Sequence, residues 1–487
     1  MCLAAGRGTR TATAVAMCLL GLLLAGCSGS FAPSRPAAVS TAPKPDAEQT
    51  AVEREHQRIL TAYGGAYEDA RLQTLISQAV DKLVAASEQP SLAYRVTILN
   101  SPAINAFALP TGQLYVTRGL IALASDTSEL ASVLAHEMAH VIARHAAIRA
   151  DQARQAALVS RVVNDVLSDP QTGALALAKS KIALASFSRA QEFEADGIGV
   201  GIAARAGYDP YGAVRFLTAM GRNADLKASA GNTDGRPLDF LSSHPATPER
   251  VGNAQTSARQ FSAPGAGAQD KPAYLAGIDG MVYGEDPSEG YVRGRRFLHP
   301  KLGFTFTAPE DFTLDNTAQA VLGIKQGGGQ ALRVDVVRVP AEQKLTEYLN
   351  SGWIENIDPR SIEEMTLNGF PSASATAKGD QWAFRLYAVR FGSEVYRFIF
   401  ATKQKTPETE RVFRQSVESF RRMSLTEIES AKPLRLKVVS VAPGDTVEKF
   451  AAQMAVLDRP AERFRVLNGL AANEQVKPGD QVKIVTE

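Results

Sequence analysis

Three of the six histidines in this 487-residue chain lie close together, at His136, His140 and His145. His136 and His140 are four positions apart, so on a helix they share one face about a turn apart. Two imidazoles at this spacing can bind one metal ion, and Glu137 can reach a water molecule on that ion. The pattern HExxH is typical of two zinc ligands and a general base. The alternative, a buried polar helix face without a metal, would bury these groups without partners, which is costly.

A catalytic zinc ion takes three protein ligands and keeps one position open, so a third ligand must come from elsewhere. In the segment 186–210, Ser188 can cap a helix that carries Glu192 and Asp196 on one face. Glu192 is the candidate ligand, and Asp196 could accept a proton from a ligating imidazole. Glu194 points roughly 160° away from Asp196 around the helix, which makes it the weaker choice. Spacing alone favours a solvated helix charge over a metal ligand for Glu192.

Two further histidines, His145 and His244, have positions that predict different roles. Five positions turn His145 roughly 140° away from His140 on a continuous helix, which predicts a structural or surface role. His244 lies before Pro245, which favours extended backbone. It could be a fourth ligand that closes the site, a donor to the oxyanion, or part of a turn that leads into a helix. Arg250 is a second candidate oxyanion donor.

Helices and strands must position these residues. We predict one long helix from Asp126 to about Ala150, with Asp126 as N-cap and Glu129 completing a capping box. Residues 51–88 have helical spacing, and residues 92–99 and 104–117 alternate as strands do. The strand around GQLYVT could pair with an extended substrate through its main chain.

The N-terminus has the features of a leader. Arg7 and Arg10 form a basic region, and a run of apolar residues follows and ends in Leu-Ala-Gly-Cys27. This ending resembles a bacterial lipoprotein box, which implies cleavage before Cys27 and a lipid on its thiol. Ser28 then suggests the outer membrane. The alternatives are an ordinary secretory signal or an uncleaved anchor.

Composition limits the partners. A hydrophobic fraction of 45% and a charged fraction of 21% are those of a globular protein. The formal net charge of +2 falls to about zero without the two leader arginines, so no nucleic acid partner is expected. After the leader, no run of 18 apolar residues predicts another membrane span.

The chain divides into segments of different pattern. We predict a signal peptide at 1–26, a flexible tether at 27–50, a metallopeptidase domain at 51–261, a linker at 262–289, an α+β domain at 290–430 and a small βααβ module at 436–486. The opening of the α+β domain, FLHPKLGFTFTAPEDF, loosely resembles Mog1 and PsbP domains. The last segment resembles a lysin-motif (LysM) domain, whose likeness implies binding to peptidoglycan. A structural cap that docks on the protease is the alternative for this segment.

Five motifs occur in a fixed order: NAFALPTGQLYVTRGL, ELASVLAHEMAHVIARH, SRAQEFEADGIGV, AGYDP and SSHPATPERV. They resemble the gluzincin family that includes BepA, HtpX, the Oma-type proteases and the CAAX prenyl endoproteases. The resemblance covers about residues 51–255 and implies a mainly α, zincin-type domain with a small β-sheet and one Zn²⁺ per chain. It implies His136, His140 and Glu192 as ligands, Glu137 as base and Asp196 in support.

The resemblance is to the soluble, periplasmic branch of that family, although the tetratricopeptide repeats common in this branch are not found. It implies a zinc endopeptidase of the bacterial envelope, lipid-anchored in the periplasm at the outer membrane, that degrades misfolded or unassembled envelope proteins. One alternative is a chaperone-like or wall-docking lipoprotein whose zinc domain mainly binds clients. Another is a peptidoglycan hydrolase, which suits LysM but not the peptide-bond motif.

Overall fold

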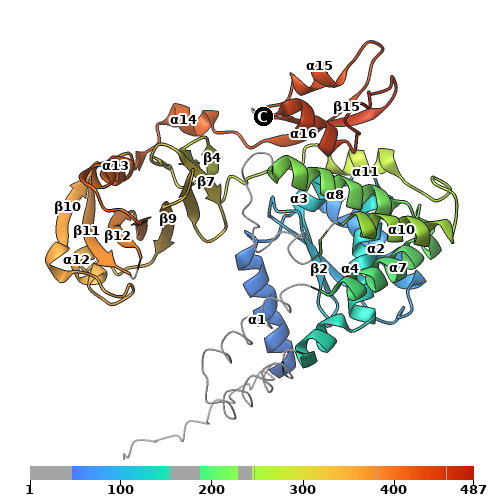
Figure 1. Cartoon of the computed structure of the whole chain (residues 1–487), viewed down its shortest axis with the longest axis horizontal. Coiled ribbons are helices and arrows are strands. Elements are labelled where there is room, and N and C mark those ends of the chain that lie inside the picture. The colour runs from blue at the N-terminus through green and yellow to red at the C-terminus, as the bar shows by residue number, and fades with distance from the viewer. Residues whose placement is uncertain are drawn as a thin grey trace, which may run out of the picture. The chain divides into compact units, whose positions relative to one another are not determined.

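The computed structural model describes residues 47–152, 154, 187–228, 244–245, 247–379, 381–456 and 458–487 (Figure 1). The predicted signal peptide, Cys27 and most of the tether lie outside these residues. Among the described residues, no helix is both long enough and apolar enough to span a bilayer.

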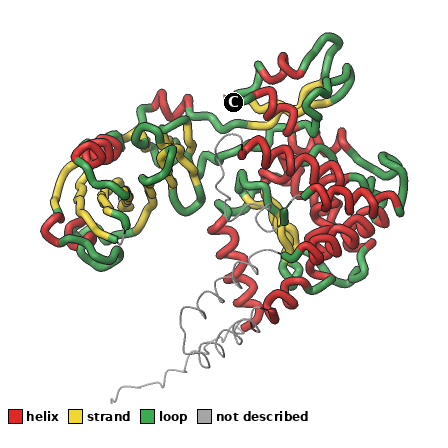
Figure 2. The backbone as a smooth tube through the Cα atoms, viewed as in Figure 1, coloured by secondary structure: helices red, strands yellow, loops and turns green. Residues whose placement is uncertain are grey.

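The predicted metallopeptidase domain is mainly helical in its described residues (Figures 1 and 2). Its helices are α1 (Ala47–Ala62), α2 (Ala70–Ala86), α3 (Arg118–Leu123), α4 (Thr127–Ile142), α7 (Arg189–Arg205), α8 (Gly212–Ala228) and α10 (Pro248–Arg259). Helix α2 shows why they pack together. Its apolar residues recur at helical spacing and are buried as one stripe: Leu72, Ile76, Ala79, Val80 and Leu83.

Helix α4 carries the HExxH pattern through the centre of this domain. Every residue from Thr127 to His140 is buried. The helix begins as predicted, because the Asp126 carboxylate accepts a hydrogen bond from the backbone N–H of Glu129. It ends earlier than predicted. Arg144 has a φ of 56°, in the left-handed region, and helical backbone resumes only at His145. The prediction of one helix to Ala150 was therefore wrong, and the turn redirects His145.

Helix α7 crosses α4 at very short range. A Cβ atom at Gly199 would lie only 2.9 Å from the backbone nitrogen of His136, closer than real Cβ contacts come. Glycine thus permits the two backbones to approach. Helix α7 begins at a capping box made by Ser188 and Gln191, as the sequence led us to expect of Ser188.

A small sheet lies beside these helices. Its described strands are β1 (Arg95–Leu99), β2 (Ala106–Ala108) and β3 (Gln113–Thr117), in the order β1-β3-β2. Strand β3 is parallel to β1 and antiparallel to β2. The GQLYVT strand is therefore paired on both sides and cannot be the edge that receives a substrate, whereas β2 lies at the edge.

The segment predicted as a linker, 262–289, contains a helix. Helix α11 (Lys271–Ile278) buries Tyr274, Leu275 and Ile278 in the same core as α2 and α4. The Tyr274 hydroxyl also donates to the carbonyl of Ile121 at 2.6 Å. The sequence did not reveal this helix for two reasons. The small and polar residues before it suggested a linker, and the apolar residues of α11 are too few to give a periodic pattern.

Residues 290–430 combine antiparallel sheets with short helices, as predicted. One sheet has the strand order β10-β11-β12-β13-β9-β8-β7, and a second has the order β14-β6-β5-β4. The strands are β4 (Tyr291–Arg293), β5 (Arg296–His299), β6 (Phe304–Thr307), β7 (Phe312–Asn316), β8 (Val321–Lys325), β9 (Gln330–Val337), β10 (Glu363–Leu367), β11 (Phe370–Lys378), β12 (Ala383–Phe391), β13 (Glu394–Thr402) and β14 (Arg421–Arg422). The helices are α12 (Leu345–Leu349), α13 (Pro407–Glu418) and α14 (Leu425–Ser430), with a 3₁₀ turn at Pro359–Ser361.

The C-terminal segment has the predicted order of strand, helix, helix and strand. These are β15 (Arg435–Ser440), α15 (Val447–Ala451), α16 (Pro460–Leu467) and β16 (Gln481–Thr486), and the two strands pair antiparallel. Its apolar residues, including Leu436, Phe464 and Ile484, belong to the same buried cluster as those of α2, α3 and α4. The segment thus shares a core with the helical domain.

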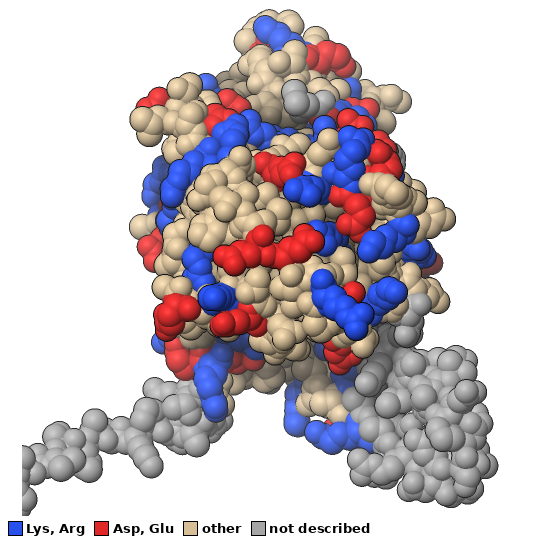
Figure 3. Space-filling model, turned by 90° about the vertical axis from the view of Figure 1, so that its left-hand side faces the viewer, with Lys and Arg blue, Asp and Glu red and all other residues tan. Residues whose placement is uncertain are grey.

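Surface charge agrees with the near-neutral composition on the face in Figure 3. Basic and acidic side chains are interspersed there, and neither sign covers the face.

Candidate metal centre

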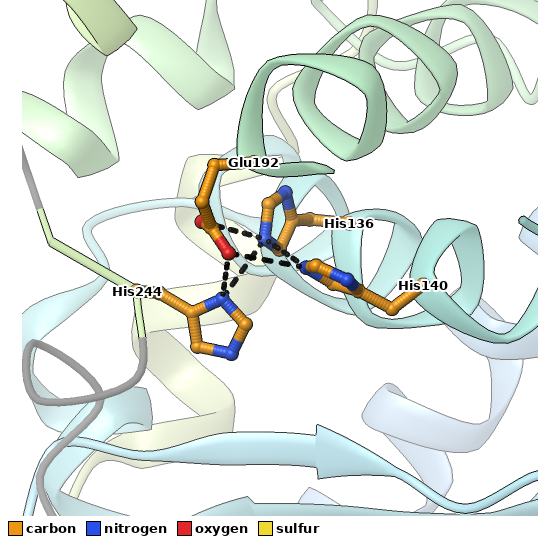
Figure 4. Close-up of side chains that lie close together, drawn as sticks. All are labelled: His136, His140, Glu192 and His244. Atoms are coloured by element: carbon orange, nitrogen blue, oxygen red, sulfur yellow. Dashed lines mark hydrogen bonds and ion pairs between the residues drawn. The ribbon is translucent and has the colours of Figure 1, made fainter. Parts of the chain in front are cut away.

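Four buried side chains point toward one another in the helical domain (Figure 4). His136 and His140 come from α4, Glu192 comes from the first turn of α7, and His244 precedes α10. One ligand atom from each lies within 4.8 Å of all the others. The structure therefore brings the three predicted ligands together and adds His244, the residue whose role the sequence left open.

The spacing of these atoms fits a tetrahedral ion. Zinc bonds of 2.0–2.2 Å place the donors of a tetrahedron about 3.3 Å apart. The observed separations are 3.0 Å from His136 Nε2 to His140 Nε2, 3.4 Å from His136 Nε2 to His244 Nδ1, 2.9 Å from His244 Nδ1 to Glu192 Oε1, and 3.5 Å from His140 Nε2 to Glu192 Oε1. Imidazole nitrogens whose lone pairs converge so closely are suited to share one cation. The donor set of three nitrogens and one oxygen suits zinc.

Asp196 and Arg250 hold the first ligand in place. Asp196, one turn after Glu192 on α7, has its Oδ1 3.0 Å from His136 Nδ1. We assign the His136 proton to Nδ1, which leaves the Nε2 lone pair directed into the site. The Arg250 guanidinium donates to both oxygens of Asp196, at 2.8 and 2.6 Å, and its Nη1 lies 2.7 Å from Glu192 Oε2.

The electrostatics of the site favour a cation. Burial lowers the pKa of His136, but hydrogen bonds with Asp196 and Glu192 outweigh this and raise the pKa to about 9. Burial and the neighbouring His136 and His244 lower the pKa of His140, so its imidazole stays neutral as a ligand must be. Two carboxylates, Asp196 and Glu192, face one guanidinium, which leaves a negative charge for a metal ion to balance.

Glu137 lies beside the four donors without joining them. Its Oε1 is 3.8 Å from His244 Nε2, and among the described residues Glu137 makes no shorter ion pair. Burial raises the pKa of its carboxyl group, while His244 and His136 oppose this rise. A carboxylate with a raised pKa beside a metal site is suited to accept a proton near neutral pH.

His145 is a buried neighbour of the site that the sequence did not predict. Its Nδ1 lies 2.9 Å from His140 Nδ1, and its Nε2 lies 3.2 Å from Glu194 Oε2. The prediction that it turns away from His140 assumed a continuous helix, and the turn at Arg144 removes that assumption. No glycine or proline marks this turn in the sequence, so the sequence gives no signal for it.

Comparison with known proteins gives a family for the same segment. Residues 67–258 match Peptidase family M48. The Beta-barrel assembly-enhancing protease of Yersinia pestis is 31% identical over 228 residues, which are 45% of each chain. The Escherichia coli (strain K12) protein of that name is 31% identical over 202 residues, 40% of each chain. Mitochondrial metalloendopeptidase OMA1 of Schizosaccharomyces pombe is 29% identical over 42% of this chain and 59% of its own length.

The chain thus spans about half the length of the curated relatives it matches. Among solved structures, the cyanobacterial PsbP of Synechocystis matches 28% of this chain and 98% of its own at a TM-score of 0.22 and 14% identity. That likeness is too weak to assign the fold of residues 290–430. The match to the peptidase family is a sequence match, and the matched segment includes all four residues whose donor atoms converge. By sequence similarity, residues 67–258 of this chain resemble peptidase family M48 and its members among the relatives named above.

Proposed function

We propose that this protein is a zinc-dependent endopeptidase of the bacterial cell envelope. One observation carries the proposal: His136, His140, Glu192 and His244 converge at tetrahedral spacing, with Glu137 beside them, inside the segment that matches peptidase family M48. His136, His140 and Glu192 would hold the zinc ion. Asp196 and Arg250 are positioning residues, since their charged groups are engaged with each other and with the ligands. This engagement argues against Arg250 as an oxyanion donor.

Glu137 is the base of the proposed reaction. Bound zinc supplies Lewis acidity, which polarises a peptide carbonyl and lowers the pKa of water. Glu137 takes the proton of the attacking water and returns it to the leaving amine. Its burial keeps bulk water away and raises its pKa, so the carboxyl group can both accept and release this proton.

His244 is proposed as a fourth ligand that closes the site. A catalytic zinc keeps one position open, whereas four protein ligands are typical of structural sites. His244 Nδ1 is 2.9 Å from Glu192 Oε1 and is buried with the other donors. A peptide carbonyl can enter only when this imidazole leaves, so the arrangement restrains the enzyme. The alternative is that His244 donates to the oxyanion after it has left.

Misfolded or unassembled envelope proteins are the proposed substrates. Strand β2 lies at the edge of its sheet and packs against α4. An extended, unfolded chain could pair with such an edge through main-chain hydrogen bonds, whereas a folded protein could not. The relatives named as beta-barrel assembly-enhancing proteases support a role in envelope protein quality control.

We propose that the chain is held in the periplasm by a lipid on Cys27, at the outer membrane. Several acyl chains anchor a protein firmly, whereas none would remain on a Cys27→Ser variant. We predict that Cys27→Ser moves the protein from the membrane fraction to the soluble periplasmic fraction. Unchanged membrane fractionation would contradict the anchor.

Residues 436–486 are proposed as a cap on the protease rather than a wall-binding module. They share a core with α2, α3 and α4, which commits one face of the segment. Binding to peptidoglycan through another face is the competing proposal. Sedimentation of the full-length chain with purified sacculi separates the two, because a cap gives no enrichment in the pellet.

The proposed activity is tested with an unfolded substrate such as casein. We predict that Glu137→Gln lowers cleavage by at least about 100-fold, because a general base contributes that much, and that it retains zinc. His136→Ala should lose both zinc and cleavage. Cleavage by Glu137→Gln at the wild-type rate, or wild-type cleavage that survives a chelator, would refute the mechanism. Binding of casein without cleavage would instead favour the chaperone-like alternative.

A further inference from the structure

His145 is buried on a segment that would otherwise be surface. Only 1% of its side chain is exposed, although the residues around it, Arg144 and Ala146, are exposed. Both of its ring nitrogens face polar atoms, His140 Nδ1 on one side and Glu194 Oε2 on the other. Burying an imidazole costs free energy, and these two contacts offset that cost.

The positions of the protons in this chain of contacts follow from its last member. Glu194 is a carboxylate with an exposed side chain, so it accepts a hydrogen bond and does not donate one. Glu194 therefore requires a proton on His145 Nε2, and in a neutral imidazole this makes Nδ1 an acceptor. His140 must then donate from Nδ1, which leaves the lone pair of His140 Nε2 directed toward His136, Glu192 and His244.

The two ligands of the HExxH pattern are thus oriented in different ways. His136 faces a carboxylate directly, because Asp196 lies 3.0 Å from its Nδ1. His140 reaches a carboxylate only through an intervening imidazole. Phe187 also contacts His140: its ring stacks on the imidazole at a centroid distance of 4.0 Å, which can orient the ring plane but cannot select a tautomer.

We propose that His145, held by Glu194, is a positioning residue that fixes the tautomer and the ring orientation of His140 for metal binding. The backbone supports this assignment. Arg144 adopts a φ of 56°, a conformation that residues other than glycine adopt at a cost, and this turn brings His145 back to His140. The inference rests on the proposed function only in taking zinc as the ion that His140 binds.

Zinc affinity tests the proposal separately from activity. Loss of a residue that orients a metal-ligating histidine typically weakens metal binding 10- to 100-fold. We expect His145→Leu to raise the zinc dissociation constant by about that factor, measured by competition with a chromogenic chelator. His145→Asn should recover most of the affinity, because its Oδ1 can accept from His140 at the position of Nδ1. Glu194→Ala, which removes an exposed side chain, should lie between the two.

A buried histidine outside the site provides the matched control. His299 is also buried, in strand β5, and accepts a hydrogen bond from the backbone of Leu302. His299→Leu should therefore cost stability and leave zinc affinity unchanged. Visible absorption of the Co²⁺-substituted protein should change in His145→Leu, because the geometry at His140 changes, and should stay as in wild type for His299→Leu.

Each outcome bears on one proposal or the other. Wild-type zinc affinity and an unchanged Co²⁺ spectrum in folded His145→Leu would overturn the positioning role. If that variant does not fold, a wild-type zinc affinity in Glu194→Ala would overturn the positioning role, because removal of Glu194 is expected to weaken zinc binding. A wild-type protein that binds zinc but cleaves no peptide bond would defeat the proposed function and leave the positioning role testable.

Discussion

At the scale of single residues, the site is organised by carboxylates that stand behind imidazoles. Asp196 faces His136 at 3.0 Å, and Glu194 faces His145, which in turn faces His140. Each contact places a proton on the outer ring nitrogen and a lone pair on the inner one. The convergence of His136, His140 and Glu192 is thus prepared by partners that bind no metal themselves.

His244→Ala tests whether the fourth donor closes the site. If the open form is a minority of about 10%, removal of His244 should raise cleavage of an unfolded substrate about tenfold. Zinc should remain bound through His136, His140 and Glu192. The measurements are the initial rate of casein cleavage and the zinc content. A lower kcat with zinc in place would instead assign His244 to the oxyanion, and an unchanged rate would leave it a structural role.

Spacing predicted part of this site and could not predict the rest. The shared face of His136 and His140, with Glu137 beside it, follows from helical geometry. Helical geometry also places Glu192 and Asp196 on one face, but only the family resemblance indicated Glu192 as a ligand. His145 did not follow, because a left-handed Arg144 interrupts a sequence that otherwise continues as a helix. Three roles stayed open for His244. It lies 104 positions after His140 in the sequence, and the sequence does not show the distance between the two side chains in space.

At the scale of elements, the site depends on how closely α7 approaches α4. Gly199 faces the backbone of His136, and Gly212 faces that of Ser128 near the other end of α4. Two glycines thus bring α7 and the start of α8 against one helix. Candidate caps and helical spacing predicted α4 and α7, but a glycine in a helix does not by itself reveal which backbone it will contact.

Gly199→Ala tests the contact between α4 and α7. The new Cβ would lie 2.9 Å from the His136 nitrogen, so one helix must shift. Overpacking of this kind typically costs about 1–3 kcal/mol of the free energy of unfolding. We also expect weaker zinc binding, because Glu192 and Asp196 move with α7. Thermal unfolding and chelator competition are the measurements.

Gly197→Ala on the same helix is the control for this prediction. Nothing lies within 4 Å of a Cβ atom built at Gly197. Alanine favours a helix over glycine by up to about 1 kcal/mol, so this variant should be as stable as wild type or more stable. Equal behaviour of the two variants would show that the close approach at Gly199 does not limit the fold.

At the scale of the whole molecule, the C-terminal segment is hydrogen-bonded to the residues that lead into α4, the helix that carries the HExxH pattern. Lys483 of β16 is buried, and its Nζ donates to the carbonyls of Ala122, Leu123 and Ala124 at 2.8, 3.3 and 2.6 Å. Those carbonyls precede Asp126, the N-cap of α4. The strand order of this segment was predictable from its sequence, but its docking was not, because a lysine normally indicates a solvated surface.

Lys483→Met tests this connection through the pH dependence of stability. Burial lowers the pKa of Lys483 to about 7, although Glu129 favours the charged form. An unfolded lysine has a pKa of about 10.4. Between these values the unfolded chain holds a proton that the folded chain lacks, so the contribution of Lys483 to stability rises with pH. Methionine cannot titrate. Subtracting the unfolding free energy of the Lys483→Met variant from that of the wild type therefore removes the contributions of groups that titrate alike in both proteins.

We expect the wild type to gain stability relative to Lys483→Met as the pH rises from about 7 to 10. At pH 9 the folded wild type holds Lys483 as a neutral amine with two N–H donors, and the variant removes both from the buried carbonyls. It should therefore be less stable by about 1–3 kcal/mol, the usual cost of unsatisfied buried groups. Urea unfolding of both proteins across this pH range measures the difference. A difference that stays flat with pH would mean that folding does not lower the pKa of Lys483. A variant as stable as wild type at pH 9 would mean that the C-terminal segment does not hold α3 through this side chain.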